Sequence, residues 1–158
     1  MAYTYISASL ADTDQLAQQL ASVLTPGSFI ALEGDLAAGK TAFSQAFARA
    51  IGVMETVNSP TFTIIKEYEG AGFPFYHMDV YRISLMEAAE LGLEDYFYGS
   101  GITLVEWASR IQPLLPPERL DIHIRRSNEE IREIDIQPHG MIYEEACQQL
   151  AERGVWKS

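Results

Sequence analysis

Apolar and polar positions in the first part of the chain change between a period of two and a helical period. Residues 4–9 (TYISAS) alternate as in a β-strand, and the spacing Asp12-x-x-Gln15 predicts a capping box that opens a helix running to about Leu24. Residues 28–33 (SFIALE) are apolar enough for a buried strand. The pattern therefore predicts strand, helix and strand in succession.

A second helix and a hairpin follow. Residues 40–51 have helical periodicity and end at Gly52, which is typical of a helix terminus. Residues 61–69 and 73–79 have the pattern of two strands, and the short linker Gly70-Ala-Gly72 between them predicts a β-hairpin. Because a hairpin pairs its strands antiparallel, we expect the sheet to be mixed.

The remaining pattern completes an α/β domain. Ser84 and Glu87 have the capping-box spacing at the start of another helix. Later segments indicate a short apolar strand at 101–106, a strand pair at 119–126 and 131–137, and a C-terminal helix at 142–153. We expect one domain, residues 1–158, of P-loop NTPase-like α/β fold with a central mixed β-sheet flanked by helices.

The loop after the second predicted strand has the sequence GDLAAGKT, residues 34–41. Phosphate-binding loops have this spacing, with backbone N–H groups and a helix N-terminus directed at the phosphates. Gly34 and Gly39 stand at the two glycine positions. Lys40 can reach the β- and γ-phosphates, and Thr41 can offer a hydroxyl to a magnesium ion. The alternative is an ordinary glycine-containing turn with a surface lysine.

Two alanines stand in this loop where such loops often carry another glycine. They are Ala37 and Ala38. Alanine at positive φ costs about 1–2 kcal/mol, so we expect both residues to have negative φ and to keep their N–H groups available.

Two acids end apolar strands. Asp79 follows residues 75–78, and Glu106 follows residues 103–105. Either carboxylate fits the acid of a P-loop enzyme's metal site, and open α/β sheets bind ligands at this end of their strands. A strand-end acid that faces solvent is the alternative for each.

The segment Ser59-Pro-Thr-Phe62 lies between the predicted second helix and the hairpin. Pro60 stiffens it, and Thr61 can offer a hydroxyl to magnesium or to a γ-phosphate. Such a segment resembles a switch that a γ-phosphate orders, and the alternative is a simple turn.

Charge and cysteine content narrow the function classes. The 158-residue chain has a formal net charge of -11, so it repels polyphosphate except where positive charge is concentrated, and we expect no strong direct binding to nucleic acid. Its single cysteine, Cys147, excludes an intramolecular disulfide and a four-thiolate zinc site. Neither a signal-peptide pattern nor a run of about 18 apolar residues is present, which favours a soluble cytoplasmic protein.

Several motifs together resemble the bacterial TsaE (YjeE) family. In chain order they are Gly34-Asp-Leu-Ala-Ala-Gly-Lys-Thr41, Ser59-Pro-Thr-Phe62, His77-Met-Asp-Val-Tyr-Arg82, Leu91-Gly92 and Val105-Glu-Trp107. The resemblance extends from about residue 28 to residue 110, and more weakly to residue 140. It implies a small P-loop ATPase required for threonylcarbamoyladenosine, a modification beside the anticodon of tRNAs that read ANN codons. It also implies ATP and magnesium as cofactors, and TsaB and TsaD as partner proteins.

The same resemblance implies roles for individual residues. Asp79 would orient metal-bound or attacking water, Thr13 and Arg132 would lie near the adenine, and Trp107 would report nucleotide binding. The implied catalytic residues are Lys40, Asp79, Glu106 and Thr61. The implied metal ligands are Thr41, Glu106 and Asp79. The implied nucleotide-binding residues are Thr13, Gly34, Asp35, Leu36, Ala37, Ala38, Gly39, Lys40, Thr41, Ala42, Ser59, Trp107 and Arg132.

The chain departs from the family pattern at two positions of the loop, which usually reads G-D-L-G-A-G-K-T-T. Ala37 replaces a glycine and Ala42 replaces the second threonine. Outside the loop, alternation places His77 on the same side of its strand as Asp79, where it can form a hydrogen bond with that acid. An oriented structural histidine and a proton shuttle are both compatible with this position.

Three other functions share the phosphate loop. A small-molecule kinase generally needs a mobile arginine-rich lid, which a chain with 11 lysines and arginines in all does not indicate. A nucleotide-gated binding module needs ATP occupancy but little turnover. A guanine-nucleotide switch is less favoured because no N-K-x-D segment occurs.

Overall fold

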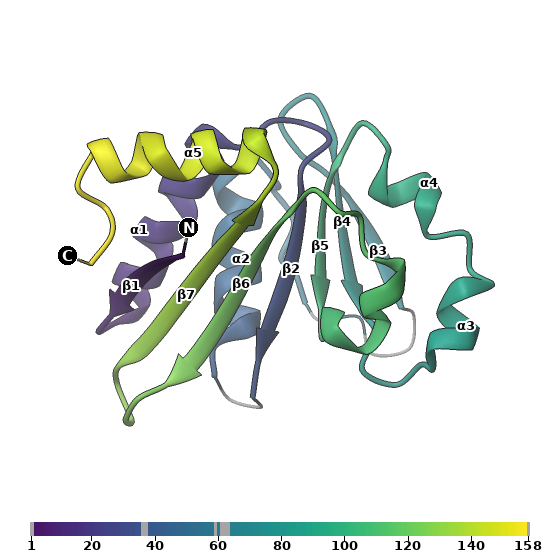
Figure 1. The fold of residues 1–158 in the computed structure, drawn as a ribbon, viewed down its shortest axis with the longest axis horizontal. Coiled ribbons are helices and arrows are strands. Elements are labelled where there is room, and N and C mark those ends of the chain that lie inside the picture. Colours follow the sequence, from purple (N-terminus) through teal and green to yellow (C-terminus); the bar gives the residue numbers. More distant parts are fainter. Residues whose placement is uncertain (1, 36–37, 59, 61–63, 158) are drawn as a thin grey trace.

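The computed structural model describes residues 2–35, 38–58, 60 and 64–157 of the chain. Figure 1 shows the arrangement of its strands and helices. In chain order they are β1 (Tyr3–Ser7), α1 (Leu10–Val23), β2 (Phe29–Gly34), α2 (Lys40–Ala50), β3 (Ile65–Glu69), β4 (Pro74–Asp79), α3 (Leu85–Ala89), α4 (Glu94–Phe97), β5 (Ile102–Glu106), the 3-10 helix η1 (Ala108–Leu114), β6 (Arg119–Arg126), β7 (Arg132–His139) and α5 (Met141–Glu152).

The strands form one seven-stranded sheet in the order β1-β7-β6-β2-β5-β4-β3. Its centre is parallel, since β2 pairs with β6 on one side and with β5 on the other, and β5 pairs in parallel with β4. The outer strand β3 and the strand β7 are antiparallel to their neighbours. The predicted mixed sheet and P-loop NTPase-like fold are therefore confirmed.

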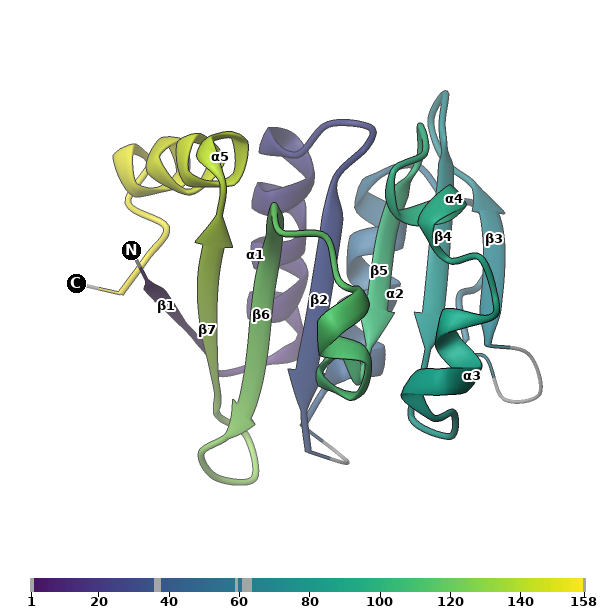
Figure 2. The ribbon, with the colours of Figure 1, turned by 45° about the vertical axis from the view of Figure 1, so that its right-hand side comes forward.

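Helices cover the two faces of the sheet unequally. One apolar cluster joins α1, α2 and α5 to one face and includes Leu16, Phe47, Leu104, Ile122 and Leu150. A smaller cluster joins α3, α4 and η1 to the other face of β2, β4 and β5. Figure 2 shows η1 and α3 in front of the sheet and α1 and α2 behind it. Because helices cover both of its faces, β5 is buried along its whole length, including its two polar residues, Thr103 and Glu106.

The first helix begins earlier than predicted. Ser9, which the pattern placed in the first strand, is the N-cap of α1, and its side chain accepts a hydrogen bond from the N–H of Asp12. The carboxylate of Asp12 in turn accepts a hydrogen bond from the N–H of Ala8. Asp12 therefore lies inside the first turn, and the prediction that Asp12 is the N-cap was wrong by three residues.

The hairpin and the second capping box were predicted correctly. β3 and β4 pair antiparallel, from Ile65 opposite Met78 to Glu69 opposite Pro74. The part of the predicted strand at residues 61–63 lies outside the described residues. Ser84 and Glu87 form both hydrogen bonds of a capping box, although α3 is short. Among the described residues, every helix falls short of the length and apolarity needed to cross a membrane.

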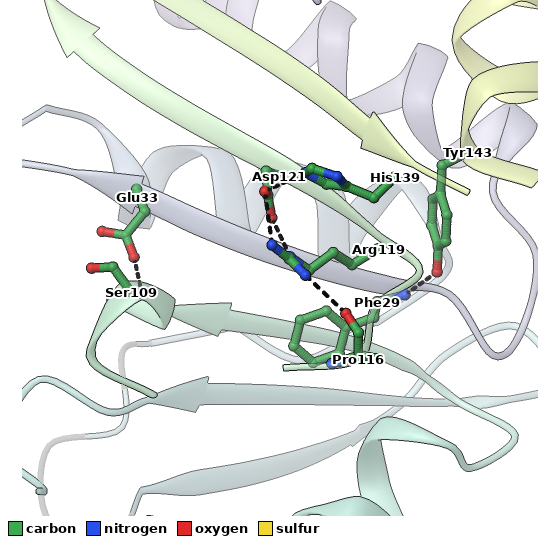
Figure 3. A network of polar contacts seen from close by, with 8 residues as sticks. All are labelled: Phe29, Glu33, Ser109, Pro116, Arg119, Asp121, His139 and Tyr143. Carbon is green, nitrogen blue, oxygen red and sulfur yellow. Dashed lines mark hydrogen bonds and ion pairs between the residues drawn. The ribbon is translucent and has the colours of Figure 1, made fainter. Parts of the chain in front are cut away.

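Polar contacts attach the peripheral segments to the central strands (Figure 3). On β6, the side chain of Arg119 bonds the carboxylate of Asp121 and the carbonyl of Pro116, and His139 on β7 bonds Asp121 at 2.7 Å. At the first residue of β2, the N–H of Phe29 donates a 2.8 Å hydrogen bond to the buried hydroxyl of Tyr143 on α5. α5 is thus linked directly to the strand that precedes the loop.

We predict that Tyr143→Phe lowers the free energy of unfolding by about 1–3 kcal/mol, because the buried N–H of Phe29 loses its acceptor. Urea unfolding followed by circular dichroism measures this loss. The matched control is Tyr98→Phe, because the side chain of Tyr98 is 65% exposed and its hydroxyl can bond water. Equal stability of the two variants would contradict the importance assigned to this bond.

Candidate functional site

The carboxyl ends of β2, β5 and β4 meet at one edge of the sheet because these strands are parallel neighbours. The loop from Gly34 to Gly39 leaves β2 at this edge and leads into α2. The connection between β6 and β7 also lies at this edge, at the bottom of Figures 1 and 2. Ligands of open α/β sheets bind at such an edge.

Both glycines of the loop are required by the backbone. A Cβ atom on Gly34 would lie 2.7 Å from the carbonyl oxygen of Ile124 on β6, so a side chain does not fit there. Gly39 has φ of 108° and ψ of 18°, a left-handed conformation that suits glycine, and it is the N-cap of α2. The two glycines thus allow the chain to turn sharply from strand to helix.

The alanine next to Gly39 has the expected sign of φ, but its N–H is already bonded within the loop. Among the described residues other than glycine, Trp107 alone has a positive φ, so Ala38 has a negative one. The N–H of Ala38 donates a 3.0 Å hydrogen bond to the carbonyl of Asp35. Leu36 and Ala37, which belong to the predicted loop, lie outside the described residues.

The ammonium of Lys40 is the only lysine charge buried in the described part of the chain. It donates hydrogen bonds to the carbonyls of Gly34 and Asp35, the second at 3.0 Å. It also lies 4.1 Å from the centroid of the Trp107 ring, a cation–π distance. Burial lowers the pKa of Lys40, and this effect is opposed by four nearby carboxylates, those of Glu106, Glu33, Asp79 and Asp35.

The two strand-end acids lie side by side. Asp79 and Glu106 are paired in register as the last residues of β4 and β5. Glu106 is buried, with 2% exposure. Asp79 accepts a hydrogen bond from the N–H of Tyr81 at 2.9 Å. Burial raises the pKa of Asp79, the Tyr81 hydrogen bond lowers it, and the charge of Glu106 raises it further.

The hydrogen bond of His77 goes to Glu106 and not to Asp79, the acid that shares its side of β4. Its Nε2 atom lies 2.6 Å from Oε2 of Glu106, and both side chains are buried. The alternation of β4 permitted a bond to Asp79, and the fold gives the bond to Glu106. The sequence placed His77 and Asp79 on the same side of β4, but only the pairing of β4 with β5 brings Glu106 beside them.

Trp107 has an unusual backbone conformation. Its φ of 63° and ψ of 34° are left-handed, which costs a residue with a side chain about 1–2 kcal/mol. Its N–H donates to the carbonyl of Leu32, and its ring centroid lies 4.7 Å from that of Tyr81. The backbone turn that ends β5 therefore places the indole against both Lys40 and Tyr81.

A cavity of about 450 Å³ adjoins the other side of the loop. It brings together Thr13, Ala38, Gly39, Ala42 and Arg132, all of which were predicted to bind the nucleotide. Its other lining residues are Ser7, Ala8, Ser9, Leu10, Ile124, Glu129 and Glu130. The N-terminal residues and the hairpin between β6 and β7 therefore share a cavity with the loop.

Arg132 and Thr13 have defined partners at this cavity. The Nε atom of Arg132 donates a 2.9 Å hydrogen bond to the carbonyl of Ala38, and its guanidinium also bonds the carbonyls of Asn128 and Glu129. The hydroxyl of Thr13 shares a 2.7 Å hydrogen bond with that of Ser7. Arg132 thus connects the loop to the hairpin.

The charges around Lys40 are compatible with a bound divalent cation. Four carboxylates act on one buried ammonium, so negative charge exceeds positive charge. Within the described ranges, no group of three or more histidine, cysteine, aspartate and glutamate side chains could alone hold a metal ion. Magnesium commonly takes only one or two protein carboxylates and completes its shell with phosphate and water. Thr41, the hydroxyl residue of the predicted metal set, is the second residue of α2.

Two predicted switch residues, Ser59 and Thr61, lie outside the described residues. The sequence also missed residues that the fold adds to the site. Glu33 acts on Lys40, and its carboxylate accepts a hydrogen bond from the N–H of Ser109. Glu33 ends a buried apolar run, which is the signal that identified Asp79 and Glu106. Nothing in the local pattern pointed to Ser7 or Tyr81.

Comparisons with known proteins agree on one family. A family model described as "Threonylcarbamoyl adenosine biosynthesis protein TsaE" matches residues 7–134. The tRNA threonylcarbamoyladenosine biosynthesis protein TsaE of Bacillus subtilis is 49% identical over 140 residues, which cover 89% of this chain and 88% of that protein. The protein of the same name from Treponema pallidum is 37% identical, with 83% and 97% of the two chains covered.

A solved structure has the same fold. The crystal structure of YdiB from Bacillus subtilis superposes with a TM-score of 0.82 and 40% sequence identity. The match covers 98% of this chain and 97% of that one. The likeness therefore includes the site edge as well as the sheet.

We predict that Asp79→Asn raises the free energy of unfolding at neutral pH. A carboxyl whose pKa is raised in the folded state costs stability at every pH above that pKa. The cost disappears below the ordinary aspartate pKa of about 3.9. Asparagine has no such charge and keeps an oxygen for the N–H of Tyr81. Urea unfolding at several pH values measures the difference, which should shrink as the pH falls through the carboxyl range. A variant less stable than the parent protein at pH 7 would contradict the destabilising effect assigned to the Asp79 charge.

Proposed function

Because this chain belongs to the TsaE family of threonylcarbamoyladenosine biosynthesis proteins, we propose that it binds ATP with magnesium at its phosphate loop and hydrolyses it. The observation that carries the proposal is the buried ammonium of Lys40, surrounded by carboxylates at the start of α2. A buried lysine beside a glycine-bounded loop is suited to phosphate, because both the ammonium and the backbone N–H groups can donate to its oxygens.

The ammonium of Lys40 is bonded to protein groups in this structure, and we expect nucleotide to replace them. Its ammonium bonds carbonyls of its own loop, at Gly34 and Asp35, and contacts the Trp107 ring. Phosphate oxygens carry formal charge and accept stronger hydrogen bonds than carbonyls do. We therefore expect the ammonium to turn toward the β- and γ-phosphates when nucleotide binds, and the emission of Trp107 to change as the cation leaves its ring.

The acids at the strand ends supply the remaining chemistry. Magnesium, held by Thr41 and Glu106, would neutralise phosphate charge and polarise the γ-phosphate. Asp79 lies next to Glu106 and is only partly buried. In our proposal Asp79 orients the attacking water and accepts its proton, because burial raises the pKa of its carboxyl and so makes the carboxylate a better base.

The cavity beside the loop is the proposed site of the adenosine. Its volume of about 450 Å³ lies within the range of roughly 300–1,000 Å³ that small-molecule pockets occupy. Thr13 offers a hydroxyl, and Arg132 offers a guanidinium plane. Because Arg132 also bonds the carbonyl of Ala38, a nucleotide that contacts Arg132 would stabilise the loop as well.

The partners proposed for this ATPase are proteins. The net charge of -11 opposes direct binding of tRNA. We propose that nucleotide turnover acts on a complex of TsaB and TsaD, and that the tRNA is bound there. Ser59 and Thr61 remain the predicted switch that would relay the state of the γ-phosphate to these partners.

We predict that the purified protein hydrolyses ATP slowly with magnesium, and that matched TsaB and TsaD stimulate it strongly. Lys40→Ala should abolish the activity because the ammonium that binds the phosphates is lost. Phosphate release measured with and without the partners tests this. Turnover unchanged by the partners would contradict partner coupling. A phosphorylated nucleoside formed in place of free phosphate would indicate a kinase.

We predict that Arg132→Ala weakens the binding of magnesium-ADP about tenfold, since it removes a charged hydrogen bond from the loop. Isothermal titration calorimetry measures the affinity. Arg153→Ala is the matched control, because Arg153 bonds Gln19 and Ser22 on the surface of α1. Equal affinities for the two variants would place the adenosine elsewhere.

A further inference from the structure

The hydrogen bond between His77 and Glu106 is buried and short. The two atoms, Nε2 and Oε2, lie 2.6 Å apart, and the side chains are 0% and 3% exposed. The residues come from neighbouring parallel strands, β4 and β5, on the face that α2 covers. Glu106 is the acid that our proposed function assigns to magnesium, so His77 contacts it from the side of the protein interior.

The geometry determines which nitrogen of His77 carries the proton. A carboxylate that is ionised, as a metal ligand has to be, can only accept, so in that state Nε2 donates to Oε2. The other nitrogen, Nδ1, is buried and has no hydrogen-bond partner in the described part of the chain. A hydrogen on Nδ1 would therefore be an unsatisfied buried donor, whereas a bare Nδ1 leaves only a lone pair without a partner. The geometry therefore favours the hydrogen on Nε2 over a hydrogen on Nδ1.

Packing holds the ring in this orientation. The ring of His77 stacks on that of Phe75, with centroids 6.0 Å apart and planes 18° from parallel. Phe75 in turn contacts the rings of Phe47 and Tyr68. A ring fixed by core aromatics cannot rotate to follow the carboxylate, so it is the carboxylate that is held in place.

We propose that His77 is a positioning residue for Glu106: its Nε2–H fixes Oε2 and so directs the second carboxylate oxygen toward the metal that accompanies the nucleotide. This inference rests on the proposed function, since it requires a metal-nucleotide complex beside Glu106. Carboxylates that bind metals are themselves hydrogen-bonded by neighbouring groups, and removing such an outer partner typically costs about 10- to 100-fold in metal affinity or activity.

The first test is made on the free protein. Two-bond proton–nitrogen correlation spectra of the imidazole distinguish the two neutral forms of His77. We expect a protonated Nε2 and a bare Nδ1. A spectrum of the opposite form would overturn the inference whatever the protein hydrolyses.

The second test compares two substitutions. His77→Phe keeps the packed ring and removes the donor, and His77→Gln loses the ring but keeps an N–H near the position of Nε2. Manganese, used in place of magnesium, is titrated into each protein with ADP and followed by electron paramagnetic resonance. We expect His77→Phe to weaken manganese binding about 10-fold or more, and His77→Gln to restore most of it. ADP affinity in EDTA should be equal in all three proteins.

Phe75→Leu is the matched control for packing. It removes the ring on which His77 stacks and leaves the donor to Glu106. Thermal melting of each variant records the stability change. If manganese affinity follows the melting temperature across His77→Phe, His77→Gln and Phe75→Leu, the role of His77 is merely structural and the inference is wrong.

The outcomes separate this inference from the proposed function. If manganese-ADP binds the parent protein and not Lys40→Ala, while His77→Phe binds as the parent does, the proposed site stands and the positioning role fails. If Lys40→Ala binds manganese-ADP as the parent protein does, the proposed nucleotide site itself fails. Under steady-state turnover, a positioning role lowers kcat/KM for magnesium-ATP in His77→Phe, and His77→Gln restores most of it.

Discussion

Parallel pairing of β2, β5 and β4 is the constraint on which the site depends. Leu32 lies opposite Glu106 in one pair of strands, and Glu106 lies opposite Asp79 in the next. This register brings the start of the loop and both acids to one edge of the sheet. A shift of one residue would turn Glu106 toward the other face, away from Lys40 and His77. Burial of β5 on both faces opposes such a shift, because every one of its residues is already enclosed.

The same edge accumulates groups that are unfavourable for the fold alone. The ammonium of Lys40 is buried, the carboxyl of Asp79 has a raised pKa, and Trp107 has a left-handed backbone. Each of these features lowers the stability of the fold. The apolar clusters on the two faces of the sheet must offset this loss. Perturbed titratable groups gathered at one end of a sheet are typical of functional sites. This concentration supports the proposed nucleotide site independently of the loop motif.

The phosphate side and the proposed adenosine side of the site are linked through backbone atoms. Lys40 bonds the carbonyls of Gly34 and Asp35, while Arg132 bonds the carbonyl of Ala38. One loop is therefore held from two directions, by its own helix and by the hairpin between β6 and β7. A ligand that draws Lys40 to itself must release the carbonyls of Gly34 and Asp35. Binding and loop conformation are coupled for that reason.

Local patterns in the sequence were enough to predict the strands, the mixed sheet, the loop glycines and the strand-end acids, although they did not predict α4 or η1. These depend on local chemistry: the period of the apolar residues, the conformations open to glycine, and the place of a polar residue after a buried run. Its error at the first helix was also local, because Asp12 and Ser9 both have capping chemistry and the pattern alone does not rank them. Thr13 and Arg132 were predicted near the adenine only through family resemblance, because they are 119 residues apart in the chain and no local pattern relates them.

Which of these residues meet depends on the fold of the whole chain. It placed Glu106, not Asp79, against His77, because the partner of a strand is chosen by the whole sheet and leaves no trace in the alternation of a single strand. It also added Glu33 to the charges around Lys40 and Ser7 to the cavity with Thr13. Contacts between strands distant in sequence are set by packing and register. The sequence therefore determined the chemical groups available to the site, and the fold decided their pairing.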